Sequence, residues 1–472
     1  MKVFSQRMNS TFRWQLLSTA GITLIQVTTL VLLGRMMGFK DLGNFALLQI
    51  TFRFALAAFE PGMFFSIIQQ HELNEPLNKK LNFIQTRFAI LTVLAFVLIF
   101  LYTQEFNAWP FAIISCLLLF TIAFGSRHHN YLILIEKQKE IAFLQILSYT
   151  IELIFIFSTI SIYPALYVFS VGILLRQLIY YSMCYYLCLH FPKMESVVSF
   201  KNISINHIRP SIHNMASQIL SFIQGQYDTL LILLLFGLQT LGPYNLASEF
   251  SFLLFSKINP IFSKAIFPSL SKANKQLSQL DKIILSSFTS YLYIIIPIYF
   301  FIWLHAEFIL NLAYPNKASE INIFVHYFLI IALIKAINNI LTTYLLSIGF
   351  SKWILHWNVL LVVSNYLICT LFLYFSIDII IFLKFNIIYA FIFTVLGIIF
   401  LFKNISVSKI RLLNTSLQLT KFLSLLIITI YANSLLCENF YLNSLLALVS
   451  FFIILYLINH QKFVQLLQFK IS

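Results

Sequence analysis

The chain has 472 residues, of which 60% are hydrophobic and only 10% are charged, and its formal net charge is +15. Its mean hydropathy of +0.87 excludes a soluble globular protein, and its repeated apolar runs of about 18 residues or more are typical of membrane-spanning helices. We therefore predict an all-α integral membrane protein. No metal site or cofactor is predicted, because the five cysteines lie mostly inside apolar runs without histidine or carboxylate partners.

We predict 14 spans from the apolar runs along the chain. A polar linker separates two groups of six, and two further spans follow. The predicted parts are an N-lobe at 1–190, a cytoplasmic linker at 191–210, a C-lobe at 211–402, and a C-terminal pair of spans with its tail at 403–472. The predicted spans are 14–36, 42–68, 83–103, 109–126, 142–160, 164–189, 212–236, 241–263, 283–304, 322–347, 353–376, 378–402, 415–434 and 440–459.

A tight turn within LLGRMMGFKDLGNFALL joins the first two spans. Gly38 suits the left-handed residue that ends a helix, and Asp41 is then the candidate N-cap of the next helix. That helix carries Arg53 and Glu60, which are seven residues apart and therefore lie on one helical face. These two side chains either neutralise each other or face a polar cavity.

Two opposite charges lie at similar depth in adjacent spans, Glu152 in the fifth and Arg176 in the sixth. A basic side chain at the centre of a span costs roughly 2.5–3.5 kcal/mol to insert, so it should face protein or water. A structural ion pair is the favoured interpretation, and contact of Arg176 with a substrate is the alternative.

After the linker, LFGLQTLGPYNL repeats the design of the first turn at an offset of 199 residues, with Thr240 as its candidate N-cap. We interpret this as a duplicated hairpin, and a chance likeness of two apolar hairpins is the alternative. Six spans separate the copies, so the two lobes should be parallel repeats. Four of the ten aligned turn residues are identical, namely Gly38 with Gly237, Leu42 with Leu241, Gly43 with Gly242 and Leu47 with Leu246.

The second hairpin and the spans after it carry more charges. Asp228 lies in the seventh span, Glu249 and Lys257 lie eight residues apart near one face of the eighth, and Lys335 lies near the centre of the tenth. Internal pairing of Glu249 with Lys257 is one interpretation. In the other, the duplicated hairpins face each other, and Arg53 and Lys257 line a polar cleft that binds an anionic ligand.

Loop charges predict the orientation. With the N-terminus inside, 21 Lys and Arg residues lie in cytoplasmic segments, and only Arg35, Lys40 and Lys317 lie on the other side. Both termini are therefore predicted to be cytoplasmic, because positive charge stays inside. This distribution also explains the basic net charge without a nucleic-acid partner.

The segments YDTLLILLLFGLQTLGPYNLASEF and INPIFSKAIFPSLSK resemble the polysaccharide flippases that export O-antigen, colanic acid and related capsule units, and GRMMGFKDLGNFALLQ looks like their first hairpin. Those proteins belong to the multidrug/oligosaccharidyl-lipid/polysaccharide exporter superfamily. The resemblance covers residues 10–75 and 212–275, and the rest fits mainly by its number of spans. The sequence Glu60-Pro61-Gly62 departs from the aspartate-led version of many relatives.

The resemblance implies two six-helix lobes around a central cavity, followed by two C-terminal helices. It implies a non-enzymatic transporter in the bacterial cytoplasmic (inner) membrane that works by alternating access. An undecaprenyl-diphosphate-linked oligosaccharide would pass from the inner to the outer leaflet, for lipopolysaccharide O-antigen or a related surface polysaccharide. Membrane lipids, a polysaccharide polymerase and chain-length proteins would be its other partners. The expected site has cations for the diphosphate or acidic sugars and acids for ion coupling or ion pairing, namely Arg53, Lys257, Lys335 and Arg176, and Asp228, Glu249 and Glu60.

Two rival functions stay open. A drug or cation antiporter of the same superfamily would be expected to have acidic lobe interiors, whereas three residues near span centres here are basic. A membrane polymerase or ligase of polysaccharide assembly usually carries a long extracytoplasmic loop with catalytic residues. The longest predicted outside loop, 305–321, has only about 17 residues.

Overall fold

The computed structural model describes residues 2–60, 83–94, 109–135, 137–190, 205–273, 277–348, 350–375 and 378–405, together with positions 424 and 449. Every regular element in these described ranges is a helix, and nine of the helices are long and apolar enough to cross a membrane. The prediction of an all-α membrane protein is therefore confirmed. The number of spans stays a prediction, because 415–434 and 440–459 lie outside the described ranges apart from those two positions.

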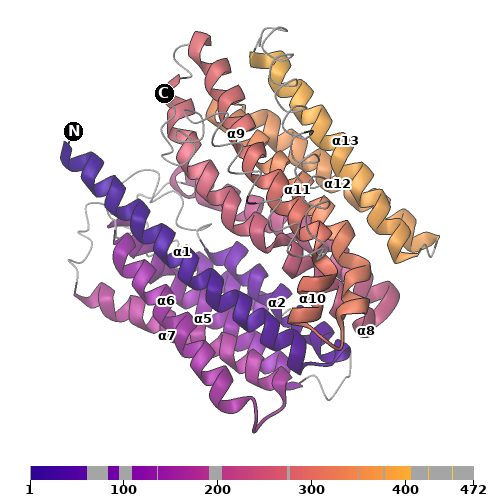
Figure 1. Cartoon of the computed structure of the whole chain (residues 1–472). Coiled ribbons are helices and arrows are strands. Elements are labelled where there is room, and N and C mark those ends of the chain that lie inside the picture. The colour runs from indigo at the N-terminus through magenta and orange to yellow at the C-terminus, as the bar shows by residue number, and fades with distance from the viewer. Residues whose placement is uncertain are drawn as a thin grey trace. The chain divides into compact units, whose positions relative to one another are not determined.

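The chain divides into two compact units, Met1–Asn245 and Leu246–Ser472, and α8 contributes to both. In the first unit α7 packs against α5 and α6, α6 packs against α1, and α2 packs against α5 (Figure 1). The predicted lobe and linker boundaries stay predictions. The helices of this unit are α1 (Lys2–Met36), α2 (Phe39–Phe59), α5 (Trp109–Leu134), α6 (Gln138–Thr159), α7 (Ala165–Leu189) and the first part of α8 (Ile205–Ala273).

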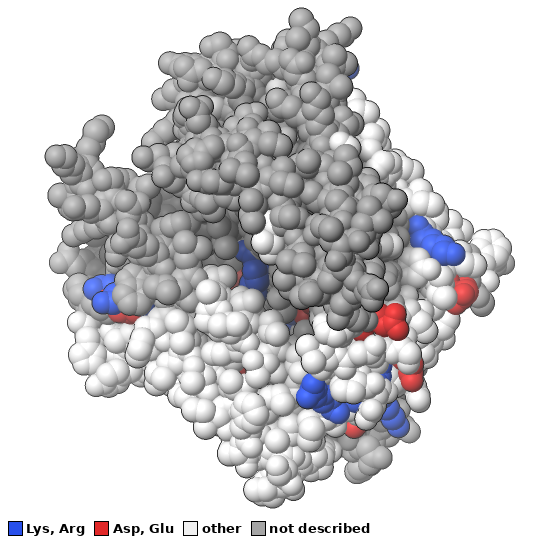
Figure 2. Space-filling model, viewed as in Figure 1, with Lys and Arg blue, Asp and Glu red and all other residues white. Residues whose placement is uncertain are grey.

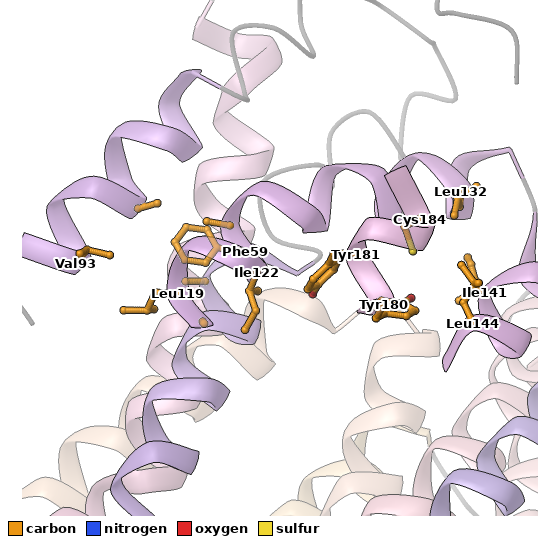
Figure 3. Close-up of a cluster of buried hydrophobic side chains, with 14 residues drawn as sticks. Phe59, Val93, Leu119, Ile122, Leu132, Ile141, Leu144, Tyr180, Tyr181 and Cys184 are labelled. Carbon is orange, nitrogen blue, oxygen red and sulfur yellow. The ribbon is translucent and has the colours of Figure 1, made fainter. Parts of the chain in front are cut away.

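An apolar cluster forms the core of the first unit (Figure 3). Phe59 of α2 and Ile122 of α5 are fully buried in it, and Tyr180 and Tyr181 of α7 are nearly so. Gly125 of α5 is needed there, because a Cβ at this position would overlap the Tyr181 ring and lie 2.6 Å from its Cδ1. The glycine therefore lets α7 approach the backbone of α5 and fixes where the Tyr181 hydroxyl lies.

In the second unit α11 is the central helix, packing against α9, α10, α12 and α13. Buried polar groups join its neighbours: the Tyr291 hydroxyl donates to Asn259 Oδ1, and Asn259 Nδ2 donates to the Ala336 carbonyl at 3.1 Å. Such bonds satisfy polar groups that have no water to bind inside a membrane. The helices after α8 are α9 (Leu277–Leu304), α10 (Ala306–Ala313), α11 (Ala318–Ile348), α12 (Ser351–Tyr374) and α13 (Ile379–Ile405).

The outer side of the second unit is apolar. The 25-residue span Ile379–Lys403 of α13 has a mean hydropathy of 2.5 and is little buried. Exposed apolar faces of this size on a helical protein mark contact with another apolar phase. Lipid is the phase that fits a helix of this length. The large exposed apolar residues of α13 are Ile381, Ile388, Phe391, Ile392, Leu396 and Ile399.

The segment predicted as the longest outside loop, 305–321, contains α10. Ala306 and Leu310 are one helical turn apart and both are fully buried. This apolar stripe packs the short helix against α9 and α11. The prediction of one continuous loop was wrong, because the stripe is too short to stand out as a span.

The two duplicated turns differ in backbone. Gly237 has φ 75° and ψ −178°, so the predicted left-handed glycine is confirmed there, and it breaks α8 into two limbs. Gly38 has φ −66°, so the same prediction was wrong for the first copy. Gly38 is itself the N-cap of α2, and Asp41 lies in the first turn, where its charge complements the helix dipole. Thr240 is not an N-cap either, because its hydroxyl donates to the Phe236 carbonyl at 3.2 Å.

Candidate functional site

Charges are sparse on the described surface. On the face drawn in Figure 2 most of the described residues are uncharged, and the charged side chains form a few separate groups. Among the described residues no group of three or more His, Cys, Asp or Glu could hold a metal ion. The polar chemistry therefore has to be sought at individual charges within the helices.

Arg176 and Glu152 form the predicted ion pair. The Arg176 Nη1 donates to Glu152 Oε2 at 2.7 Å, and both side chains are buried between α7 and α6. The guanidinium also lies over the Tyr149 ring, 4.3 Å from its centroid, and 5.4 Å from that of Phe52. An arginine in this setting is neutralised and held within the first unit.

The pair belongs to a longer polar chain in the first unit. Gln26 of α1 donates through Nε2 to the Tyr149 hydroxyl at 3.0 Å. Tyr149 in turn carries the Arg176 guanidinium on its face. The chain thus ties α1, α6 and α7 together at the depth where charge is most costly.

Glu60 at the end of α2 accepts a short hydrogen bond from the Tyr181 hydroxyl of α7. Arg53 lies on α2, seven residues earlier, and is half-buried. The neighbouring Tyr180 shares a hydrogen bond of 2.6 Å with His129 Nδ1 of α5. The two tyrosines stack edge to face at 5.1 Å, so an acid and a histidine lie on either side of an aromatic pair.

The role of His129 was missed in the sequence, where it was placed in a loop. Helix α5 continues to Leu134, past the predicted end of the span at 126. The signal lay in the apolar run YLIL after the histidines, which continues the helical pattern. Tyr181 was missed for another reason: its partner Glu60 lies 121 residues away in the chain.

Asp228 lies on the first limb of α8, and its partners hold the two limbs together. Its Oδ2 accepts from the Tyr244 hydroxyl at 3.2 Å, and its Oδ1 accepts from the Thr229 backbone N–H at 2.9 Å. Tyr244 is buried and lies beyond the break at Gly237. The acid thus fixes the second hairpin as one body.

The second unit holds the remaining predicted residues. Glu249 and Lys257 of α8 are half-buried. Lys335 is exposed near the middle of α11, and its Nζ lies over the Phe252 ring of α8, 5.0 Å from the centroid. No carboxylate pairs with Lys335 in the part of the chain that the structure describes. Lys335 is therefore a solvent-facing cation with an aromatic support.

The structure brings together Arg176 with Glu152, and it supplies aromatic partners for Glu60, Asp228 and Lys335. It gives no direct contact that joins all seven predicted residues. The cleft formed by spans 1, 2, 7 and 8 stays a prediction.

A family model described as "Polysaccharide biosynthesis protein" matches residues 32–322. The chain belongs to this polysaccharide biosynthesis family. The match includes both duplicated turns and the charged helices α2, α6, α7 and α8. No curated protein sequence matches the chain.

Solved structures share the fold of this family member. A lipid II flippase, MurJ, in an inward closed conformation has a TM-score of 0.70 at 14% identity, covering 94% of this chain and 98% of its own. A multidrug resistance MATE family transporter of the MOP superfamily, inward-facing, has a TM-score of 0.61 at 13% identity, covering 82% and 94%. Its outward-facing counterpart has a TM-score of 0.58 at 12% identity, covering 84% and 96%. The polysaccharide biosynthesis protein thus has the fold of these membrane transporters.

Proposed function

We propose that this protein flips an undecaprenyl-diphosphate-linked oligosaccharide from the inner to the outer leaflet of the bacterial cytoplasmic membrane by alternating access. One combination carries the proposal: a member of a polysaccharide biosynthesis family has the fold of a lipid II flippase. Surface polysaccharides are assembled from sugars on lipid carriers, so a member with this fold would move the carrier. The protein then acts without catalysing a reaction, and a polysaccharide polymerase and chain-length proteins would use the unit that it delivers.

Lys335 is the cation that fits the diphosphate best. An exposed lysine in the middle of an apolar helix cannot face lipid, so it faces water or a ligand. The Phe252 ring beneath it restrains the ammonium without neutralising it. A lysine is a point charge suited to phosphate oxygens. We therefore place the phosphate groups against Lys335, with Lys257 of α8 and Arg53 of α2 as further cations.

Arg176 would take part differently. Its charge is already balanced by Glu152 at 2.7 Å. A substrate phosphate can reach it only by replacing that carboxylate. We therefore assign Arg176 to substrate binding only in a state in which the ion pair has opened.

The acidic residues are proposed for ion coupling. Glu60 and Asp228 each accept a hydrogen bond from a tyrosine, and Glu249 is a third half-buried acid. A carboxylate held by a tyrosine hydroxyl can take up a proton and exchange donor for acceptor without moving. Coupling to a proton or sodium gradient would use one of these acids, and ion pairing is the alternative role.

Lipid analysis of a deletion strain tests the function. If the protein is the flippase, undecaprenyl-linked oligosaccharide should accumulate on the cytoplasmic face and surface polysaccharide should be lost. Finished units that reach the outer face but stay unpolymerised would instead assign a polymerase role. The fold shared with a MATE transporter favours a drug antiporter as second candidate, and drug sensitivity with intact polysaccharide would support it.

Variants test the cations. Lys335→Met should abolish export, and Lys335→Arg should keep much of it. Lys384→Met is the matched control, because Lys384 is also exposed but lies near the end of α13. Arg53→Ala should abolish export and Arg53→Lys should restore part of it. Full export by Lys335→Met and Arg53→Ala, at protein levels equal to the parent, would show that the cationic assignment is wrong.

A further inference from the structure

Two glycines make a close backbone contact where α2 meets the break in α8. A Cβ on Gly43 would overlap the Leu238 carbonyl group, lying 3.0 Å from its carbon. A Cβ on Gly242 would overlap the Phe39 carbonyl group, again 3.0 Å from its carbon. Only glycine allows two backbones to come this close. We call the four residues Phe39, Gly43, Leu238 and Gly242 the glycine joint.

The two contacts are reciprocal. Gly43 and Gly242 are equivalent positions of the duplicated turn, and so are Phe39 and Leu238, because each pair is 199 residues apart. Each glycine thus meets the residue that is equivalent to its partner's neighbour. A contact in which i meets j while the equivalent of j meets the equivalent of i is the signature of a twofold axis. The two copies of the hairpin therefore face each other here, which supports duplication over chance likeness.

The surroundings of the joint are dry and nearly uncharged. The equivalent residues Leu42 and Leu241 are buried beside it, and so are Phe45 and Tyr244. A single side-chain bond is printed across it among the described residues, in which Asn245 Nδ2 donates to Gln49 Oε1 at 3.2 Å. Both partners are neutral amides, and water can replace each half of such a bond at little cost.

We propose that the glycine joint is a gate that seals one end of the substrate path and parts once in each transport cycle. This rests on the proposed function. Backbones in contact leave no room for a sugar or a phosphate, so the path is shut wherever the joint is closed. Each side comes from a different copy of the repeated hairpin, so rocking of the repeats would separate the glycines first. By the predicted orientation the joint lies at the outer face, where the turns with Arg35 and Lys40 emerge.

Cysteine cross-linking in a cysteine-free protein tests the gate. Gln49→Cys with Asn245→Cys should form a disulfide on oxidation, export should stop, and a reductant should restore it. The control pair is Gln85→Cys with Ser126→Cys, whose parent side chains are bonded at 2.8 Å inside the first unit. The control cross-link should leave export unchanged. Export by the cross-linked gate variant would make the joint a fixed pivot and overturn the proposal, as would failure of the gate pair to cross-link.

A second measurement needs no substrate. Gly242→Leu should wedge the Phe39 carbonyl away, so a single Gln49→Cys should react several-fold faster with a membrane-impermeant thiol reagent added outside. Equal labelling with and without the leucine would overturn the gate. If labelling rises while the deletion strain accumulates no lipid-linked oligosaccharide, the gate stands and the substrate assignment falls.

Discussion

At the residue scale, the buried charges show what a sequence can and cannot reveal. The pairing of Arg176 with Glu152 could be predicted, because both lie at similar depth in adjacent spans and an unpaired charge there is costly. The Tyr149 ring under the guanidinium could not be predicted, because it depends on how α6 is rotated about its axis. The same holds for Tyr181 with Glu60 and for Phe252 with Lys335.

Breaking the ion pair should be more harmful than removing it. Arg176→Met or Glu152→Leu alone leaves one charge buried, and each should lower stability by about 3–5 kcal/mol. The double variant, which leaves no charge, should be more stable than either single variant. Thermal unfolding in detergent measures this, and a double variant whose losses simply add would contradict the pairing.

His305 should make stability depend on pH. It is buried between α9 and α10 and lies outside the membrane spans, and burial lowers its pKa below the usual 6.5. In acid the unfolded chain therefore binds a proton that the folded chain does not, so folding stability should fall as pH drops through the unfolded pKa. His305→Gln should flatten this part of the melting-temperature profile. Profiles that fall equally in both proteins would contradict it.

At the element scale, apolar runs located the helices but not all of their ends. Helix α5 continues past the predicted end because the charged and polar residues 127–130 sit within an otherwise apolar pattern. The short helix α10 escaped because span-length windows average over its two turns. The turn glycines were identified as special, yet only Gly237 has a positive φ. Gly43 and Gly242 are required by a neighbour from a distant segment, which local patterns do not reveal.

The approach of α7 to α5 should depend on Gly125. Gly125→Ala forces a Cβ into the Tyr181 ring, so it should destabilise the protein by about 1–3 kcal/mol. Gly397→Ala is the control, because its Cβ would lie 3.9 Å from the nearest atoms, Asn338 Oδ1 and Leu341 Cδ1. It should be neutral or stabilise α13 by up to about 1 kcal/mol. Equal melting temperatures of the two variants would show that the α5–α7 contact is not as close as described.

At the scale of the whole molecule, composition was enough to predict the class of fold. Hydropathy and the absence of soluble-protein patterning pointed to an all-α membrane protein, and the helices confirm it. Composition could not tell which helices share a unit. The predicted division follows the polar linker at 191–210, whereas contacts divide the chain at Asn245 and Leu246, inside α8. The reason is physical: the limb of α8 before residue 245 contacts α2 through the glycine joint.

Topology can be tested on the whole chain in intact cells. In the cysteine-free protein, Lys40→Cys should react with an impermeant thiol reagent added outside, because Lys40 is exposed at the turn before α2. Lys272→Cys should react only after the membrane is made permeable. Labelling of Lys272→Cys from outside would reverse the predicted orientation and overturn the cytoplasmic placement of the termini.

The length of α11 has a consequence for the bilayer. Its apolar stretch Ala318–Ser347 has 30 residues, which makes it about 45 Å long. The hydrocarbon layer is only about 30 Å thick, and headgroups bring the total to about 40–45 Å. The packing surface that α11 offers to α9, α12 and α13 therefore continues through both headgroup layers. Shorter acyl chains would shift the outer helices along α11 instead of moving the unit as one body, so membrane thickness becomes a variable that tunes this unit's packing.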